Sequence, residues 1–240
     1  MTDSLQRAGT VKRDGSNMSE REIQRIKCPK CGAEHDFEIW TRVNTDLDPI
    51  LKEKVMNGEI FRTVCPSCGQ QIGVVYPCLY HEMENKVMIY YAPGEEAMKN
   101  AQAAFDEGVD ATFKERGFDH SKSGYRNRVV GSLYDLQEKI AIFDAGFDDR
   151  VVEICKVLIG SELQQSNPEA VFDDLLFYKD SGGGRLALMR EGNAFASITL
   201  PGDIYTEVAD RYRPLIDQYG DEKVIDMEWV MNSVSRAEQK

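Results

Sequence analysis

The chain has 240 residues, of which 42% are hydrophobic and 29% are charged, a composition typical of soluble globular proteins with one or two domains. No stretch approaches the roughly 18 apolar residues that a membrane helix needs, and the first seven residues lack the apolar core of a signal peptide. We therefore expect a cytoplasmic protein with no membrane partner.

The net charge of −12 is distributed unevenly along the chain. Residues 1–91 carry 12 Lys and Arg against 13 Asp and Glu, whereas residues 92–240 carry 17 against 28. Nucleic-acid-binding proteins gain much of their affinity by pairing basic side chains with phosphates. Because the sequence contains no basic stripe, we expect that nucleic acid is not a partner and that binding to non-specific duplex DNA is negligible.

A leader and two domains are predicted from the order of polar and apolar residues. Residues 1–22 are polar and form a disordered leader, in which Met18 is a second candidate for the translation start beside Met1. Residues 23–92 form a four-cysteine, zinc-ribbon-like antiparallel β domain with a helical insertion. Residues 93–240 form an acidic α+β domain with a helix hairpin and a small antiparallel sheet, so the fold class is α+β.

The first domain should alternate strands with one short helix. Period-two alternation predicts a strand over 35–43, and a helix capped by Asp46 or Asp48 should end at Gly58. A strand follows over 60–64. A hairpin is predicted from residues 71–79 and 86–91, with 81–85 as its turn.

Two five-residue segments of this domain share the pattern Cys-Pro-x-Cys-Gly: 28–32 and 65–69. The two thiolates of such a segment can turn onto one ion, and two segments close the tetrahedral shell that Zn²⁺ prefers. The sequence therefore predicts one zinc ion per chain, bound by Cys28, Cys31, Cys65 and Cys68. Iron in the same shell and disulfides of a secreted protein are the alternatives. The other two cysteines, Cys78 and Cys155, lie in apolar stretches and should be buried core residues.

In the second domain, helical and strand patterns occur in separate blocks. A helix is predicted from Glu95 to Gly117 and a short strand over 128–130. Two helices, 133–143 and 148–164, should form a hairpin. The remaining predicted elements are strands over 175–179, 185–190 and 194–200, an amphipathic helix over 203–219, and a last segment containing Trp229. Gly182–Gly184 should be a turn, because no Lys-Ser or Lys-Thr follows as in a phosphate loop.

Several motifs of the sequence together resemble the bacterial and archaeal CpXC family. They are the paired cysteine segments, Glu38-Ile39-Trp40, the stretch from Leu51 to Phe61, Tyr80-His81-Glu82-Met83, and the run from Leu136 to Arg150. The resemblance covers about residues 23–160 well and the remainder loosely. It implies that Cys28, Cys31, Cys65 and Cys68 form the family's defining site, and it implies no particular activity. The 17 residues before Met18 differ from the short starts typical of the family.

Other polar residues are weaker candidates for function. His35 could be an alternative metal ligand, but a surface histidine at a strand start is the favoured interpretation. His81, with Glu82 and Glu84, is expected in a solvated turn rather than in a general-base or metal site, and His120 receives no role. At the bend of the helix hairpin, aspartates among Asp144, Asp148 and Asp149 should cap the second helix and Arg150 should pair with one of them; a binding site there is the alternative.

A closed four-thiolate site favours a structural metal, because catalytic zinc keeps one position open for water or substrate. The sequence therefore predicts a non-enzymatic, zinc-binding interaction or regulatory module whose partner is another protein or a second copy of itself. Two alternatives stay open: a transcription-related zinc ribbon that binds nucleic acid, and an enzyme with a carboxylate site in the C-terminal part. The sequence identifies no small-molecule ligand.

Overall fold

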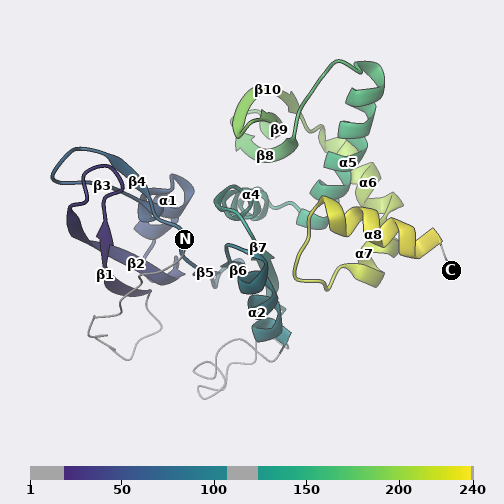
Figure 1. Ribbon diagram of the computed structural model, residues 1–240. Coiled ribbons are helices and arrows are strands. Elements are labelled where there is room, and N and C mark those ends of the chain that lie inside the picture. The colour runs from purple at the N-terminus through teal and green to yellow at the C-terminus, as the bar shows by residue number, and fades with distance from the viewer. Residues whose placement is uncertain (1–18, 107–123, 239–240) are drawn as a thin grey trace. The chain divides into compact units, whose positions relative to one another are not determined.

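The computed structural model describes residues 19–106 and 124–238, and the chain divides into two compact units, Met1–Leu133 and Tyr134–Lys240 (Figure 1). The described residues form seven α-helices, one 3-10 helix and three sheets, which confirms the mixed α+β class. None of the described helices is both long and apolar enough to traverse a bilayer. Predictions for residues 1–18, for the end of the helix that starts at Glu95, and for His120 lie outside the described residues.

The first unit contains a five-stranded sheet in the order β1-β2-β5-β6-β7. Its strands are β1 (Glu20–Lys27), β2 (Glu34–Asn44), β5 (Cys78–Glu82), β6 (Val87–Tyr91) and β7 (Arg126–Val130). The β1/β2 and β5/β6 pairs are antiparallel, whereas β2/β5 and β6/β7 are parallel. Both faces of β5 are buried, so its sequence lacks the alternation that identifies a half-exposed strand such as β2.

The remaining elements of this unit lie between or after these strands. They are α1 (Ile50–Met56), the 3-10 helix η1 (Glu59–Phe61), β3 (Arg62–Val64), β4 (Gln71–Gly73) and α2 (Glu95–Asp106). β3 and β4 form a separate two-stranded sheet. Residues 71–79 are therefore not one strand as predicted: β4 ends at Gly73 and β5 starts at Cys78, directly after Pro77, which lacks the N–H that a continuous ladder requires.

One boundary differs from the sequence-based expectation. β1 starts at Glu20 and pairs along its length with β2, so residues 20–22 are ordered rather than part of a disordered leader. The first compact unit extends to Leu133, because β7 pairs with β6 and completes the sheet. The division into domains at 92/93 stays a prediction.

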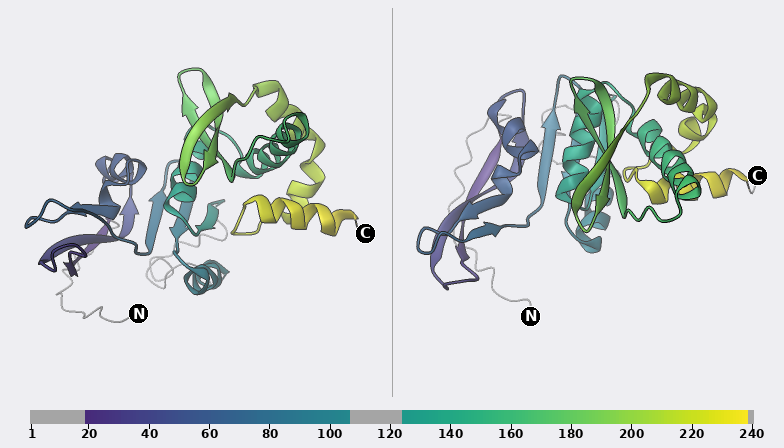
Figure 2. Two further views of the ribbon diagram at one scale, coloured as in Figure 1. Left: turned by 45° about the horizontal axis from the view of Figure 1, so that its top comes forward. Right: turned by 90° about the horizontal axis from the view of Figure 1, so that it is seen from above.

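The second unit combines a helix hairpin with a three-stranded antiparallel sheet (Figure 2). The hairpin is α4 (Leu133–Asp144) and α5 (Asp149–Ser166). The sheet has the order β10-β9-β8, with β8 (Asp174–Asp180), β9 (Gly183–Arg190) and β10 (Asn193–Thr199). Three helices follow: α6 (Gly202–Arg211), α7 (Arg213–Tyr219) and α8 (Met227–Glu238). Buried Leu136, Ile140, Val152, Leu175 and Leu186 form part of its core.

The helix predicted over 203–219 is interrupted at Tyr212. Pro214 lies in the first turn of α7, where its missing N–H costs nothing, whereas in a continuous helix its ring would clash with the preceding turn. A turn forms near the three glycines but earlier than predicted: Ser181 and Gly182 connect β8 to β9, whereas Gly183 and Gly184 belong to β9.

Candidate metal centre

The two Cys-Pro-x-Cys-Gly segments have the same backbone conformation. Each follows a strand, β1 or β3, and leads into the antiparallel partner of that strand. The N–H of Gly32 donates to the carbonyl of Cys28 at 2.9 Å, and the N–H of Gly69 donates to that of Cys65 at 2.9 Å. Gly32 and Gly69 have φ of 74° and 72°, a left-handed conformation that glycine adopts without steric cost.

These turns bring the four predicted cysteines together. Their Sγ atoms all lie within 4.8 Å of one another, with Cys28 and Cys68 at 3.7 Å and Cys31 and Cys65 at 3.6 Å. A disulfide would require about 2.05 Å, and all four cysteines are free. Zinc–sulfur bonds of about 2.3 Å give a tetrahedron with edges of about 3.8 Å, so both distances fit thiolates around one ion. The described residues contain no other such group of His, Cys, Asp or Glu.

The electrostatics of the cluster also fit a cation. The backbone N–H of Cys31 is the main cause that lowers the pKa of Cys28 to about 6. The N–H of Gln70 acts to lower the pKa of Cys68, but burial and the neighbouring thiols together raise it to about 12. Crowded thiolates repel one another, and a divalent cation among them removes this obstacle to ionisation.

Aromatic packing connects the second cysteine segment to the five-stranded sheet. The ring of Tyr76 lies 4.9 Å from that of Phe61, and its hydroxyl donates to the carbonyl of Ile60 at 2.6 Å. Phe61 in turn makes an edge contact with Tyr91 of β6 at 5.4 Å. Because Phe61 directly precedes β3, displacement of the second segment would also disturb this packing.

The comparisons with known proteins agree with the cysteine pattern. A family model described as CpXC protein matches residues 26–156, which is more than half of the chain. The chain belongs to the CpXC family. This confirms the resemblance identified from the sequence, and the matched CpXC region contains all four clustered cysteines. Neither the search of curated proteins nor the search of solved structures found a match.

The structure places the predicted histidines of the CpXC region away from the cluster. His35 is the second residue of β2 and is half-buried, rather than a surface residue, and both of its ring nitrogens are buried. The group of side chains that could hold a metal ion consists of the four cysteines and does not include His35. His35 is therefore not brought to the candidate metal centre.

His81 is not in a solvated turn as expected. It lies in β5, is 2% exposed, and its Nε2 is 3.0 Å from the hydroxyl of Tyr125. The turn begins at Met83, because Asp46 accepts hydrogen bonds from the N–H groups of Met83 and Glu84. Backbone pairing of β5 with β2 thus extends past the predicted end of the strand.

Glu82 is also buried in β5, and its carboxylate is fully engaged. Lys52 donates to its two oxygens at 3.1 and 3.2 Å, Asn85 donates at 2.6 Å and the hydroxyl of Tyr80 donates at 2.8 Å. Of the predicted trio, only Glu84 is in the exposed turn. These contacts favour a structural role for Glu82.

At the bend of the helix hairpin, two of the predicted roles are confirmed. Asp148 caps α5 by accepting from the N–H of Arg150 at 3.0 Å, and it also pairs with the guanidinium of Arg150 at 2.6 Å. Asp149 has a different role, because its side chain is fully buried and lies 3.4 Å from Lys139. Asp144 ends α4 and is not part of this cap.

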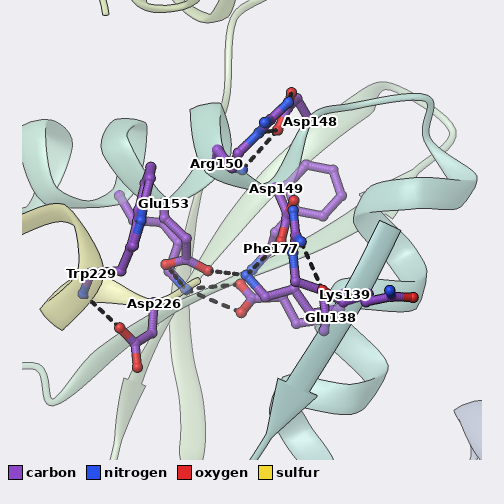
Figure 3. Close-up of polar contacts among 12 residues, drawn as sticks. Glu138, Lys139, Asp148, Asp149, Arg150, Glu153, Phe177, Asp226 and Trp229 are labelled. Carbon is purple, nitrogen blue, oxygen red and sulfur yellow. Dashed lines mark hydrogen bonds and ion pairs between the residues drawn. The ribbon is translucent and has the colours of Figure 1, made fainter. Parts of the chain in front are cut away.

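Asp149 belongs to a buried charge network that the sequence analysis did not identify (Figure 3). Lys139 contacts Glu153 at 2.8 Å, and Lys156 contacts Glu153 at 3.0 Å and both oxygens of Glu138 at 3.1 Å. The N–H of Phe177 in β8 also donates to Glu138, at 2.5 Å. The network joins α4, α5 and β8 inside the second unit.

The network carries three carboxylates and two ammonium groups, so its members influence one another strongly. Burial raises the pKa of Glu138 to about 7, although Lys156 opposes this. Burial also acts to lower the pKa of Lys139, but Glu153 and Asp149 outweigh it and raise this pKa. A signal was present in the sequence: residues 149, 153 and 156 are spaced at i, i+4 and i+7 in the first part of α5, where the other residues up to Gly160 are apolar except Arg150.

Proposed function

We propose that the CpXC cluster binds one zinc ion, that this zinc is structural, and that the protein is a non-enzymatic interaction module. The observation that carries the proposal is the spacing of the four Sγ atoms: two pairs lie 3.7 and 3.6 Å apart and all four lie within 4.8 Å, which fits the edge of about 3.8 Å of a zinc tetrathiolate. Four thiolates complete the shell and leave no position for water or substrate. Ionised, reduced thiols fit a cytoplasmic location.

Ion pairs of four basic residues in the first unit support a protein partner rather than nucleic acid. Arg25, Arg42, Lys52 and Lys54 form ion pairs with Glu34, Glu20, Glu82 and Glu59, respectively. A basic side chain that is already paired with a carboxylate contributes less to phosphate binding. Negligible binding of the full-length protein to non-specific duplex DNA therefore stays our prediction.

The carboxylates of the second unit support a structural role better than a catalytic one. Glu138, Asp149 and Glu153 are each at most 4% exposed, and each contacts a buried lysine. A carboxylate that acts on a substrate must be reachable from solvent. We therefore prefer the interaction module to an enzyme with a carboxylate site in this part of the chain.

Metal analysis tests the zinc site. We expect purified wild-type protein to contain about one zinc per chain, because thiolate tetrads of this spacing favour zinc over harder metals. Cys31→Ser should lose the metal, since three thiolates and a hydroxyl bind zinc far more weakly. Cys155→Ala is the matched control, because Cys155 is a buried cysteine of the second unit whose pKa burial raises to about 12.

The test has clear contrary outcomes. Iron in place of zinc would correct the identity of the metal, and four freely reactive thiols in metal-free native protein would refute the site. Equal metal content in Cys31→Ser and wild type would mean that the metal is bound elsewhere. Co-purification of cellular proteins with the zinc-loaded chain then tests the interaction role separately from the metal.

A further inference from the structure

The edge strands of the two larger sheets differ in how they are protected from pairing with another chain. β1 has five charged residues of eight, and β7 contains Arg126 and Arg128. β8 contains Asp174, Lys179 and Asp180. β10, Asn193–Thr199, has no charged residue among its seven. Charged side chains on an edge hinder pairing with further strands, so β10 is the one long edge of the described sheets without this protection.

The outer side of β10 faces solvent. Six of its seven residues are exposed, and Phe195 exposes 48% of its surface. In the part of the chain that the structure describes, β9 is the only strand that pairs with β10. Figure 1 shows β10 on the side of its sheet away from α4. One row of backbone N–H and C=O groups along β10 is therefore open to a partner strand.

Side chains of β9 hold β10 in an extended conformation. Arg185 donates to the hydroxyls of Ser197 at 2.8 Å and Thr199 at 3.3 Å, and the guanidinium of Arg190 lies 4.9 Å from the centre of the Phe195 ring. A strand that is already ordered loses little conformational entropy when a second strand pairs with it. The edge is thus preformed for binding.

We propose that β10 is a self-association edge, at which β10 of a second copy pairs in antiparallel orientation and joins the two three-stranded sheets into one of six strands. This names the partner for the interaction role proposed above and rests on that role, but it does not depend on the metal. A symmetric pair would place Ala196 opposite Ala196 of the second copy, and Phe195 opposite Ser197.

The charge distribution indicates where a second copy can approach. Residues 134–240 carry 11 Lys and Arg against 21 Asp and Glu, so two copies repel one another over most of this unit. The uncharged β10 is the place where they can approach with least repulsion. A basic partner segment would find no carboxylate on β10, whereas a second β10 covers two unprotected edges at once.

The geometry predicts a weak dimer. One pair of seven-residue strands buries less than the roughly 1,200 Å² of a standard stable interface. The register with β9 also shifts between Ala194 and Ala196, and such a bulge bends the edge and shortens the usable ladder. We therefore expect a dissociation constant on the order of micromolar rather than nanomolar.

Sedimentation equilibrium of the zinc-loaded full chain tests this proposal. Raising NaCl from about 0.01 M to about 1 M shortens the Debye length from about 30 Å to about 3 Å, so the dimer should become tighter with salt. Ala196→Lys and Ala196→Glu should each weaken dimerisation about tenfold or more, because like charges then meet at the two-fold axis. An equimolar mixture of the two variants should restore the dimer.

Ala237→Lys is the matched control, because Ala237 is an exposed residue of α8 and should leave dimerisation unchanged. The mixture separates repulsion from misfolding, since two unfolded variants would not restore a dimer. A wild-type chain that stays monomeric at high concentration and high salt overturns the proposal, as does a dimer that both Ala196 variants retain. So does a mixture that stays monomeric, or a wild-type chain that captures a different protein through β10. Zinc measured in the same samples shows independently whether the metal site has failed.

Discussion

At the scale of single residues, the second unit contains a buried charge network. Lys156 contacts Glu138 and Glu153, and both carboxylates are at most 4% exposed. Buried ion pairs add little net stability compared with apolar packing, but removal of one partner leaves an uncompensated charge in the core. The network is therefore sensitive to the loss of any member.

Lys156→Met should lower the free energy of unfolding by about 3–5 kcal/mol, because it leaves two carboxylates without their shared ammonium group. Urea unfolding followed by circular dichroism measures the change. Lys179→Met is the control, since Lys179 is exposed in β8, and it should change stability by less than about 0.5 kcal/mol.

A double variant separates charge from packing. Glu138→Gln combined with Lys156→Met removes one charge of each sign and should recover part of the loss. If Lys156→Met and Lys179→Met destabilise equally, the network contributes nothing specific.

The cysteine cluster could be predicted from the sequence, whereas the charge network could not. Two local segments predict Cys28, Cys31, Cys65 and Cys68. Glu138 and Lys156, in contrast, are 18 residues apart and meet only after α4 and α5 pack.

At the scale of elements, strong local signals were the most predictable. The helix hairpin and the three strands after it follow from apolar periodicity and from the turn at Ser181 and Gly182. The end of β5 was predicted wrongly, because its pairing with β2 and the hydrogen bonds from Met83 and Glu84 to Asp46 depend on residues distant in sequence. Tertiary pairing there outweighs the local turn pattern.

Gly184 of β9 lies against two aromatic side chains of its own unit. A Cβ at this position would be 2.8 Å from Phe147 and 2.9 Å from Phe177. The two rings already pack edge to face at 5.6 Å, so they have little room to move. Gly184→Ala should therefore lower the free energy of unfolding by about 1–3 kcal/mol.

Gly202→Ala is the control for Gly184→Ala in the same urea measurement. No atom lies within 4 Å of the corresponding Cβ, and Gly202 starts α6, so alanine should be neutral or stabilise by up to about 1 kcal/mol. Equal effects of the two substitutions would indicate that the aromatic contact does not limit the space at Gly184.

At the scale of the whole molecule, the chain has two units with separate sources of stability. The first unit contains the cysteine cluster and the aromatic contacts around Phe61, whereas the second contains the charge network and the apolar seam of α4 and α5. The CpXC family match spans residues 26–156 and so includes the cluster and both helical halves of the network. Local motifs identified the cluster, but the composition could not indicate where the compact units divide.

Cys65→Ser tests whether the metal stabilises only its own unit. Structural zinc contributes binding energy directly to folding, so loss of one thiolate should destabilise residues 23–92 by several kcal/mol. Hydrogen exchange should then accelerate in β1, β2, β3 and β4, while amides of α4 and α5 keep their protection because their packing contains no ligand. Chelation of the metal from wild-type protein should reproduce this pattern. Cys78→Ala replaces a buried cysteine outside the cluster and should retain the metal.

Unchanged exchange in residues 23–92 of Cys65→Ser would show that the fold of the first unit does not depend on the ion. Equal acceleration in both units would show that the two units unfold as one.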